Sequence, residues 1–169
     1  MQIPRRPPRT HRPLYTAEQR QRRDATRWTL VQGVLAPLQF LVFAVSVILV
    51  LRYLATGEGF AAATASVLIK TALLYLIMVT GSVWEKVVFG QWLFAPAFYW
   101  EDVFSMLVLA LHTAWLVAVF TGTLGPQGQM WLALAAYASY LINATQFLLK
   151  LRAARLDEAH RGAPQGAPA

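Results

Sequence analysis

Long apolar runs alternate with short polar breaks along most of this chain. Four runs are long enough to cross a hydrocarbon layer, which takes about 20 apolar residues in a helix; they cover residues 28–51, 60–84, 103–121 and 130–149. Glycines, joined by one proline in the second break, separate the first run from the second and the third from the fourth. The pattern predicts an all-α membrane protein, a bundle of four transmembrane helices.

The flanks of these runs are polar and basic. Residues 1–27 are predicted to form a basic arm that is disordered over residues 1–13 and juxtamembrane beyond them, where Thr16 and Gln19 predict a capping box for a short helix that runs to Trp28. Residues 150–169 are predicted to form a basic tail that is disordered from Gly162. The first apolar run, 24 residues long, exceeds a secretory signal and indicates an uncleaved span.

Charge adds an orientation to this bundle. The chain is 57% hydrophobic and 14% charged with a formal net charge of +7, and only seven of its 23 charges fall between residues 28 and 149. Thirteen Lys and Arg residues flank the spans on the side of the termini, whereas Arg52 alone flanks them on the other side. The positive-inside rule therefore predicts cytoplasmic termini, and it explains the basic excess better than a nucleic-acid partner does.

Polar residues recur on one face of the third and fourth spans. Glu101, Ser105, Val108 and His112 follow helical spacing, and Ser139, Asn143, Gln146 and Lys150 repeat it. We interpret the uncharged members, together with polar residues of the first span, as interhelical hydrogen-bonding groups; these are Gln32, Gln39, Ser46 and Ser139.

Ionisable residues are costly in a span and mark candidate functional positions. Glu85, Glu101, Asp102 and His112 form this group, and the carboxyl groups gather at one end of the spans. Lys70 has two open interpretations, since it could pair with a carboxylate or extend toward the outer face. The absence of cysteine excludes disulfides and thiolate metal sites.

The segment between the second and third spans is unusual for a cytoplasmic loop. Residues 85–102 hold six aromatic side chains between acidic ends. Such a composition predicts an interfacial or re-entrant loop and a surface on which a flat apolar ligand could dock.

Three stretches then resemble one family. DATRWTLVQGVLAPLQFLVF, TGSVWEKVVFGQWLFAPAFYWEDVFSMLVLALHTAW and YLINATQFLLKLRAAR are similar to the 3-vinyl bacteriochlorophyllide hydratases of phototrophic bacteria, over about residues 15–156. The resemblance implies a hydro-lyase in the bacterial inner membrane that adds water to the C3 vinyl group of a chlorophyllide or bacteriochlorophyllide during bacteriochlorophyll synthesis. It implies no cofactor, since magnesium belongs to the pigment. It implies membrane lipids, and other enzymes of that synthesis, as partners.

For this chemistry the candidate general acid is Glu101 or Glu85, and the candidate base is Asp102 or His112. His112 has three open roles: axial ligand to the pigment's magnesium, acid or base, or structural hydrogen-bonding group. The pigment's propionate needs a cation, for which Lys86 is better placed than Lys150 or Arg152. The candidate substrate-binding residues are Lys86, Trp92, Phe98, Trp100, Asn143, Gln146 and Lys70. The alternative function is a membrane pigment carrier or assembly factor for bacteriochlorophyll intermediates, without enzymatic activity.

Overall fold

The computed structural model describes the chain from residue 14 to residue 162, with side chains up to residue 156, and all regular structure in that range is helical. The segments predicted to be disordered, residues 1–13 and the tail from Gly162, lie outside the described residues, apart from Gly162 itself, which ends the last helix. Four helices are long and apolar enough to cross a membrane, which confirms the predicted all-helical membrane bundle. The element order is α1 (Ala17–Ala25), α2 (Arg27–Thr56), α3 (Phe60–Phe89), α4 (Tyr99–Thr121) and α5 (Pro126–Gly162).

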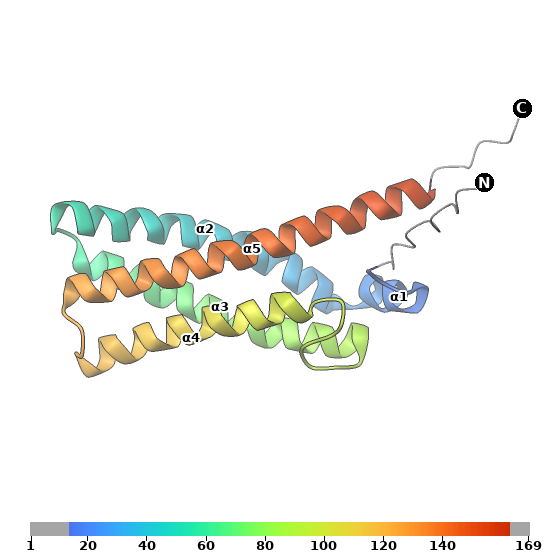
Figure 1. Ribbon diagram of the computed structural model, residues 1–169, viewed down its shortest axis with the longest axis horizontal. Coiled ribbons are helices and arrows are strands. Elements are labelled where there is room, and N and C mark those ends of the chain that lie inside the picture. Colours follow the sequence, from blue (N-terminus) through green and yellow to red (C-terminus); the bar gives the residue numbers. More distant parts are fainter. Residues whose placement is uncertain (1–13, 163–169) are drawn as a thin grey trace, which may run out of the picture.

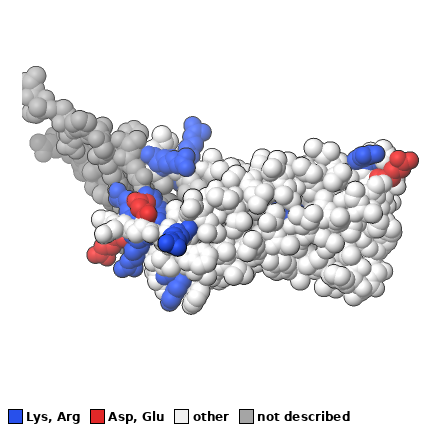
Figure 2. Space-filling view, turned by 180° about the vertical axis from the view of Figure 1, so that it is seen from behind, with Lys and Arg blue, Asp and Glu red and all other residues white. Residues whose placement is uncertain are grey.

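The long helices run up and down in sequence, so that each lies antiparallel to the next (Figure 1). The most extensive packing joins α2 to α3 and α4 to α5. The loop between α3 and α4 lies at the same end of the bundle as α1 and the last turns of α5 (Figure 1). Seen from behind, charged side chains gather at the two ends of the molecule and the band between them is almost uncharged, as a membrane-spanning body requires (Figure 2).

The helices extend beyond the apolar runs that predicted them. Helix α3 continues through Glu85 to Phe89, and α4 begins at Tyr99, so the loop is confined to residues 90–98. A helix is ended by capping rather than by the edge of the hydrocarbon layer. Gly90 ends α3 in the left-handed conformation, with φ of 81°, and its N–H donates to the Lys86 carbonyl oxygen. Both acidic ends of the segment therefore lie on helices.

Helix α1 confirms the predicted capping box but is shorter than expected. The Thr16 hydroxyl accepts from the Gln19 N–H and the Gln19 side chain accepts from the Thr16 N–H. The predicted extension to Trp28 is wrong, because Thr26 takes an extended conformation and caps α2 with its own side chain. The chain therefore turns between α1 and the first span.

Polar side chains join the long helices, as predicted for two of the four residues. Gln32 donates to Thr80 over 2.8 Å, and the Ser46 hydroxyl lies 2.7 Å from that of Ser66 and 2.5 Å from that of Tyr137. The prediction is wrong for Ser139, whose hydroxyl donates to a carbonyl of its own helix, a bond that any helical serine can form. Gln39 is buried without a hydrogen bond to any described residue.

Candidate active site

The loop between α3 and α4 is held by two carboxyl groups, one from each helix. Asp102, in the first turn of α4, accepts a hydrogen bond from the Phe94 N–H over 2.7 Å. Glu85, near the end of α3, accepts one from the Ala95 N–H over 3.3 Å. Both carboxyl groups are buried. The acidic residues at the ends of this segment therefore meet underneath its centre.

Phe94 is the strained point of this loop. Its φ of 60° places a bulky side chain in the left-handed region, where it is the one non-glycine residue within the described chain. Such a conformation costs about 1–3 kcal/mol and persists only when its surroundings impose it. The bonds from the Phe94 and Ala95 N–H groups to Asp102 and Glu85 hold the backbone at this point.

Glu85 and Asp102 hold neighbouring residues of the same loop, and the charge of Asp102 acts on the Glu85 carboxyl group. Two carboxylate ions at one buried site repel each other, and a shared proton relieves this repulsion. The loop therefore covers a buried pair of carboxyl groups that is suited to sharing one proton.

A third carboxyl group beside this pair carries a different partner. Glu101 Oε2 lies 2.5 Å from Lys150 Nζ, which joins α4 to α5, and the charges of both residues act on Asp102. The acidic residues also benefit from their position at the amino end of α4. Together Glu85, Glu101, Asp102 and Lys150 form what we call the carboxylate cluster.

Aromatic side chains surround this cluster in two layers. A buried layer packs beneath the loop and contains Tyr15, Trp84, Phe89, Phe98 and Phe147. Phe98 is 2% exposed, so it belongs to this core. An outer layer, the aromatic patch, consists of exposed or partly exposed rings at Trp92, Phe94, Tyr99 and Trp100. The aromatic patch, and not the buried layer, is therefore the apolar surface that the loop exposes.

Contacts within the patch fix its rings. Phe94 and Tyr99 have centroids 5.8 Å apart, and Tyr99 and Trp100 are in edge contact at 5.6 Å. The Ser82 hydroxyl donates to the Trp92 carbonyl oxygen, which ties this part of the loop to α3. The exposed Lys86 lies beside the patch, with its Nζ 5.8 Å from the Trp92 ring and 2.9 Å from the Gly90 carbonyl oxygen.

Comparison with known proteins assigns this arrangement to a family. A family model described as 2-vinyl bacteriochlorophyllide hydratase matches residues 15–153, which include the whole carboxylate cluster and the aromatic patch. The chain belongs to this hydratase family. A 2-vinyl bacteriochlorophyllide hydratase of Cereibacter sphaeroides is 75% identical over 155 residues, covering 91% of this chain and 96% of the relative. One of Rhodobacter capsulatus is 69% identical over 151 residues, covering 89% and 87%. No solved structure matches.

In this member of the hydratase family, two other predicted site residues lie far from the loop. His112 is eleven residues from Glu101 along α4, which corresponds to about 16 Å. Lys70 of α3 lies at the level of His112, is 0% exposed, and forms no ion pair with a described carboxylate. Neither interpretation offered for Lys70, a carboxylate partner or an outward extension, describes its position.

Asn143 and Gln146 lie between these two levels. Asn143 Nδ2 donates to the Ser105 hydroxyl over 2.8 Å and joins α5 to α4, as expected for a polar stripe that faces a neighbouring helix. The side-chain amide oxygens of Asn143 and Gln146 are buried and accept no hydrogen bond from a described residue. Within the described part of this hydratase-family chain, no group of three or more His, Cys, Asp and Glu residues could hold a metal.

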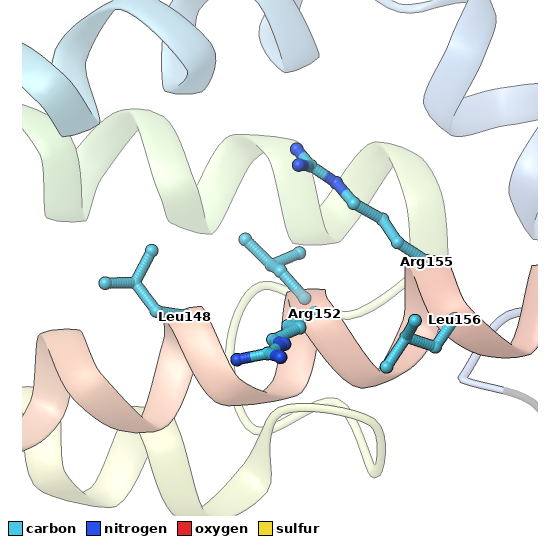
Figure 3. Close-up of a pocket in the computed structure, with 5 residues that line it drawn as sticks. Leu148, Arg152, Arg155 and Leu156 are labelled. Carbon is cyan, nitrogen blue, oxygen red and sulfur yellow. The ribbon is translucent and has the colours of Figure 1, made fainter.

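A groove on the last turns of α5 is separate from the cluster. It has a volume of about 500 Å³ and is lined by Leu148, Leu151, Arg152, Arg155 and Leu156 (Figure 3). Helical spacing places Leu148, Arg152 and Arg155 on the side of α5 opposite to Lys150. Arg152, the third candidate cation for a propionate, therefore faces away from the carboxylate cluster.

Sequence reasoning missed two residues of this hydratase-family site. Tyr15 is 4% exposed and stacks on Phe89 with centroids 5.8 Å apart, although it lies in the basic arm, for which no packing against the bundle is predicted. The match of the family model, which begins at residue 15, is the signal that this tyrosine belongs to the folded unit. Phe147 stacks on Phe98 from α5; in the sequence it is one apolar residue among many in a span.

Proposed function

We propose that this protein adds water to the ring vinyl group of a bacteriochlorophyllide-type pigment, numbered 2 in the relatives' name and C3 above, to form a 1-hydroxyethyl group. Membership of the hydratase family supports the reaction. The observation that carries the site is the buried pair of Glu85 and Asp102 beneath the loop, because two neighbouring carboxyl groups can share and transfer a proton beside an exposed aromatic surface. We place the chemistry at this pair.

The reaction proceeds by proton transfer. The terminal vinyl carbon takes the proton from the pair and forms a C–H bond with the π electrons, which leaves positive charge on the inner carbon for the macrocycle to delocalise. The oxygen of water bonds to that carbon and then loses a proton to a carboxylate. The sum is the addition of one H₂O without net oxidation or reduction, so no redox cofactor is needed.

Three groups divide the work in this proposal. The Glu85–Asp102 pair donates the proton and is restored by the proton that the water gives up. The Glu101 carboxylate, fixed by Lys150, accepts an O–H of the attacking water and orients it. The aromatic patch binds one face of the macrocycle, since flat apolar ligands favour such surfaces.

His112 does not fit the same pigment as an axial ligand. Its Nδ1–H donates to the Val108 carbonyl oxygen, which leaves Nε2 free, as in many metal-ligating histidines. However, His112 is 0% exposed and about 16 Å along α4 from Glu101. The magnesium of a tetrapyrrole lies much closer than this to a vinyl group at its edge. We therefore assign neither magnesium ligation nor proton transfer to His112.

We further propose that the protein lies in the inner membrane with both termini in the cytoplasm. The clustering of Lys and Arg at the end that carries α1 and the end of α5 supports it (Figure 2). The carboxylate cluster then lies at the cytoplasmic boundary, where both water and a pigment held in the membrane have access.

The test of this function is conversion by the purified protein alone. Incubation of the detergent-solubilised chain with the vinyl pigment should move the absorption bands of the pigment to shorter wavelength, because the vinyl group leaves the conjugated system. Mass spectrometry should show a gain of one water. Binding of the pigment without this conversion would instead support the carrier function.

The aromatic patch also predicts which cation holds the pigment's carboxylate. Lys86 lies beside Trp92 and uses one of its three N–H donors for Gly90, so Lys86→Gln should weaken pigment binding about tenfold, as expected for a charge-assisted hydrogen bond. A fluorescence titration measures this affinity. Arg152→Gln is the matched control and should leave the affinity unchanged. Weaker binding in Arg152→Gln together with unchanged binding in Lys86→Gln would indicate that the pigment binds in the groove on α5.

A further inference from the structure

Two charged or polar side chains in the middle of the bundle take no part in the proposed reaction. Lys70 and His112 are both 0% exposed, and neither Lys70 Nζ nor His112 Nε2 has a hydrogen-bond partner among the described residues. Buried polar groups in proteins are nearly always paired, with protein or with ordered water. The Tyr140 ring gives the Lys70 ammonium group a cation–π contact, but it accepts none of the hydrogen bonds that the three N–H groups can donate.

The two groups occupy one level of the bundle. Lys70 Nζ lies 3.6 Å from the centroid of the Tyr140 ring, and the His112 ring is 5.9 Å from that of Tyr137. Tyr137 and Tyr140 are three residues apart and share one face of α5. The charge of Lys70 also acts on His112. Side chains from α3 and α4 therefore converge on a single face of α5 without bonding to each other.

The hydrogen-bonding chemistry of this place is complementary. A carbonyl oxygen only accepts, so the 2.8 Å contact with Val108 requires a proton on His112 Nδ1, and Nε2 then presents a lone pair. A second proton on the ring would put a positive charge next to Lys70 in a dry interior. Lys70 presents N–H donors. A bridging group must therefore accept from Lys70 and donate to His112.

Water satisfies both demands, whereas a halide or a carboxylate ion satisfies only the first. Buried side chains close the place on both sides: Val67 and Trp115 lie toward one end of the bundle, and Leu74 and Val108 lie toward the other, each at most 4% exposed. The one polar atom among these side chains is the indole N–H of Trp115, which has no hydrogen-bond partner among the described residues. A water molecule held here would be separated from bulk solvent and from the carboxylate cluster. Buried waters of this kind make about three hydrogen bonds and belong to the fold.

We propose that Lys70 and His112 bind an internal water molecule, which links α3 to α4 in the middle of the membrane. This water is distinct from the water consumed at the carboxylate cluster. The link fixes the position of α3 relative to α4. These two helices carry Glu85 and Asp102 at the end of the bundle where the loop lies, so the water site is a structural part of the bundle.

Solid-state NMR of the full chain labelled with ¹⁵N-histidine tests the site directly. Magnetisation should pass from water protons to His112 Nε2, whose signal is assigned by its loss in His112→Phe. The transfer should weaken in Lys70→Met, which removes one partner of the water. Ser139→Ala, which alters a satisfied buried hydroxyl of α5, should match the unchanged protein. Absence of transfer in the unchanged protein overturns the proposal.

Thermal stability gives a second, independent measure. Lys70→Met or His112→Phe alone should lower Tm by about 4 °C, because each leaves the water with an unpaired group. The double variant should lie closer to the unchanged protein, since both partners are then apolar. A rise in Tm for Lys70→Met alone would mean that Lys70 is simply an uncompensated charge, and the water site would be wrong.

Discussion

Glu85→Gln is expected to lower the rate of vinyl hydration at least 100-fold while the protein still folds and binds pigment. The glutamine oxygen can still accept from the Ala95 N–H, and Asp102 still accepts from the Phe94 N–H, so the loop keeps both bonds. The variant cannot, however, carry the proton that the carboxyl pair shares. General acid catalysis is typically worth a factor of 10² to 10⁴. Turnover is measured from the absorption change of the pigment.

Two further variants make this result decisive. Asp102→Asn should reduce turnover to a similar extent, because either substitution removes one member of the pair. Glu58→Gln changes an exposed glutamate in the break between α2 and α3 and should leave turnover unchanged. If both Glu85→Gln and Asp102→Asn retained near-normal turnover, the pair would be only the support of the loop.

Lys150→Met is expected to reduce stability and turnover together. The change leaves Glu101, whose side chain is 9% exposed, without its ion-pair partner. Loss of one member of a buried pair costs about 3–5 kcal/mol, and the partial exposure of Lys150 reduces this to about 2 kcal/mol, or about 5 °C in Tm. A carboxylate that is no longer fixed should orient water less well, with a loss of about tenfold in rate.

The control for Lys150 is the arginine substitution. Lys150→Arg keeps the charge and reaches the same carboxylate, so it should restore most of both properties. Circular dichroism during heating and the pigment assay check the two effects separately. Unchanged stability and rate in Lys150→Met would show that the contact with Glu101 contributes nothing in solution.

The helices and their polar faces are readable from the sequence because both depend on local spacing. The stripe from Glu101 to His112 is buried as its period indicates, and the facing stripe of α5 supplies Lys150 to it. Which members of the stripes pair is set by the register of two antiparallel helices, and no local pattern encodes that register. The Glu101–Lys150 ion pair therefore emerges only from the packing.

The centre of the candidate site was less accessible to prediction. Glu85 and Asp102 are 17 positions apart, and they meet because the loop folds back over them with Phe94 in a left-handed conformation. Composition favours glycine or asparagine for that conformation, so phenylalanine gave no warning of it. Tyr15 was hidden for a related reason, since a single aromatic residue among arginines and prolines has no apolar period to reveal its burial.

The position of Tyr15 links the biogenesis of the protein to its chemistry. The ring covers the buried aromatic layer beneath the loop, and Arg23 lies over the same ring at 4.8 Å. In the proposed orientation, the segment whose arginines retain the amino terminus in the cytoplasm is thus also a structural part of the site. A chain inserted in the opposite orientation would carry this segment and the loop across the membrane together. The orientation that the chain takes during membrane insertion therefore determines from which side of the membrane the folded enzyme receives its protons and water.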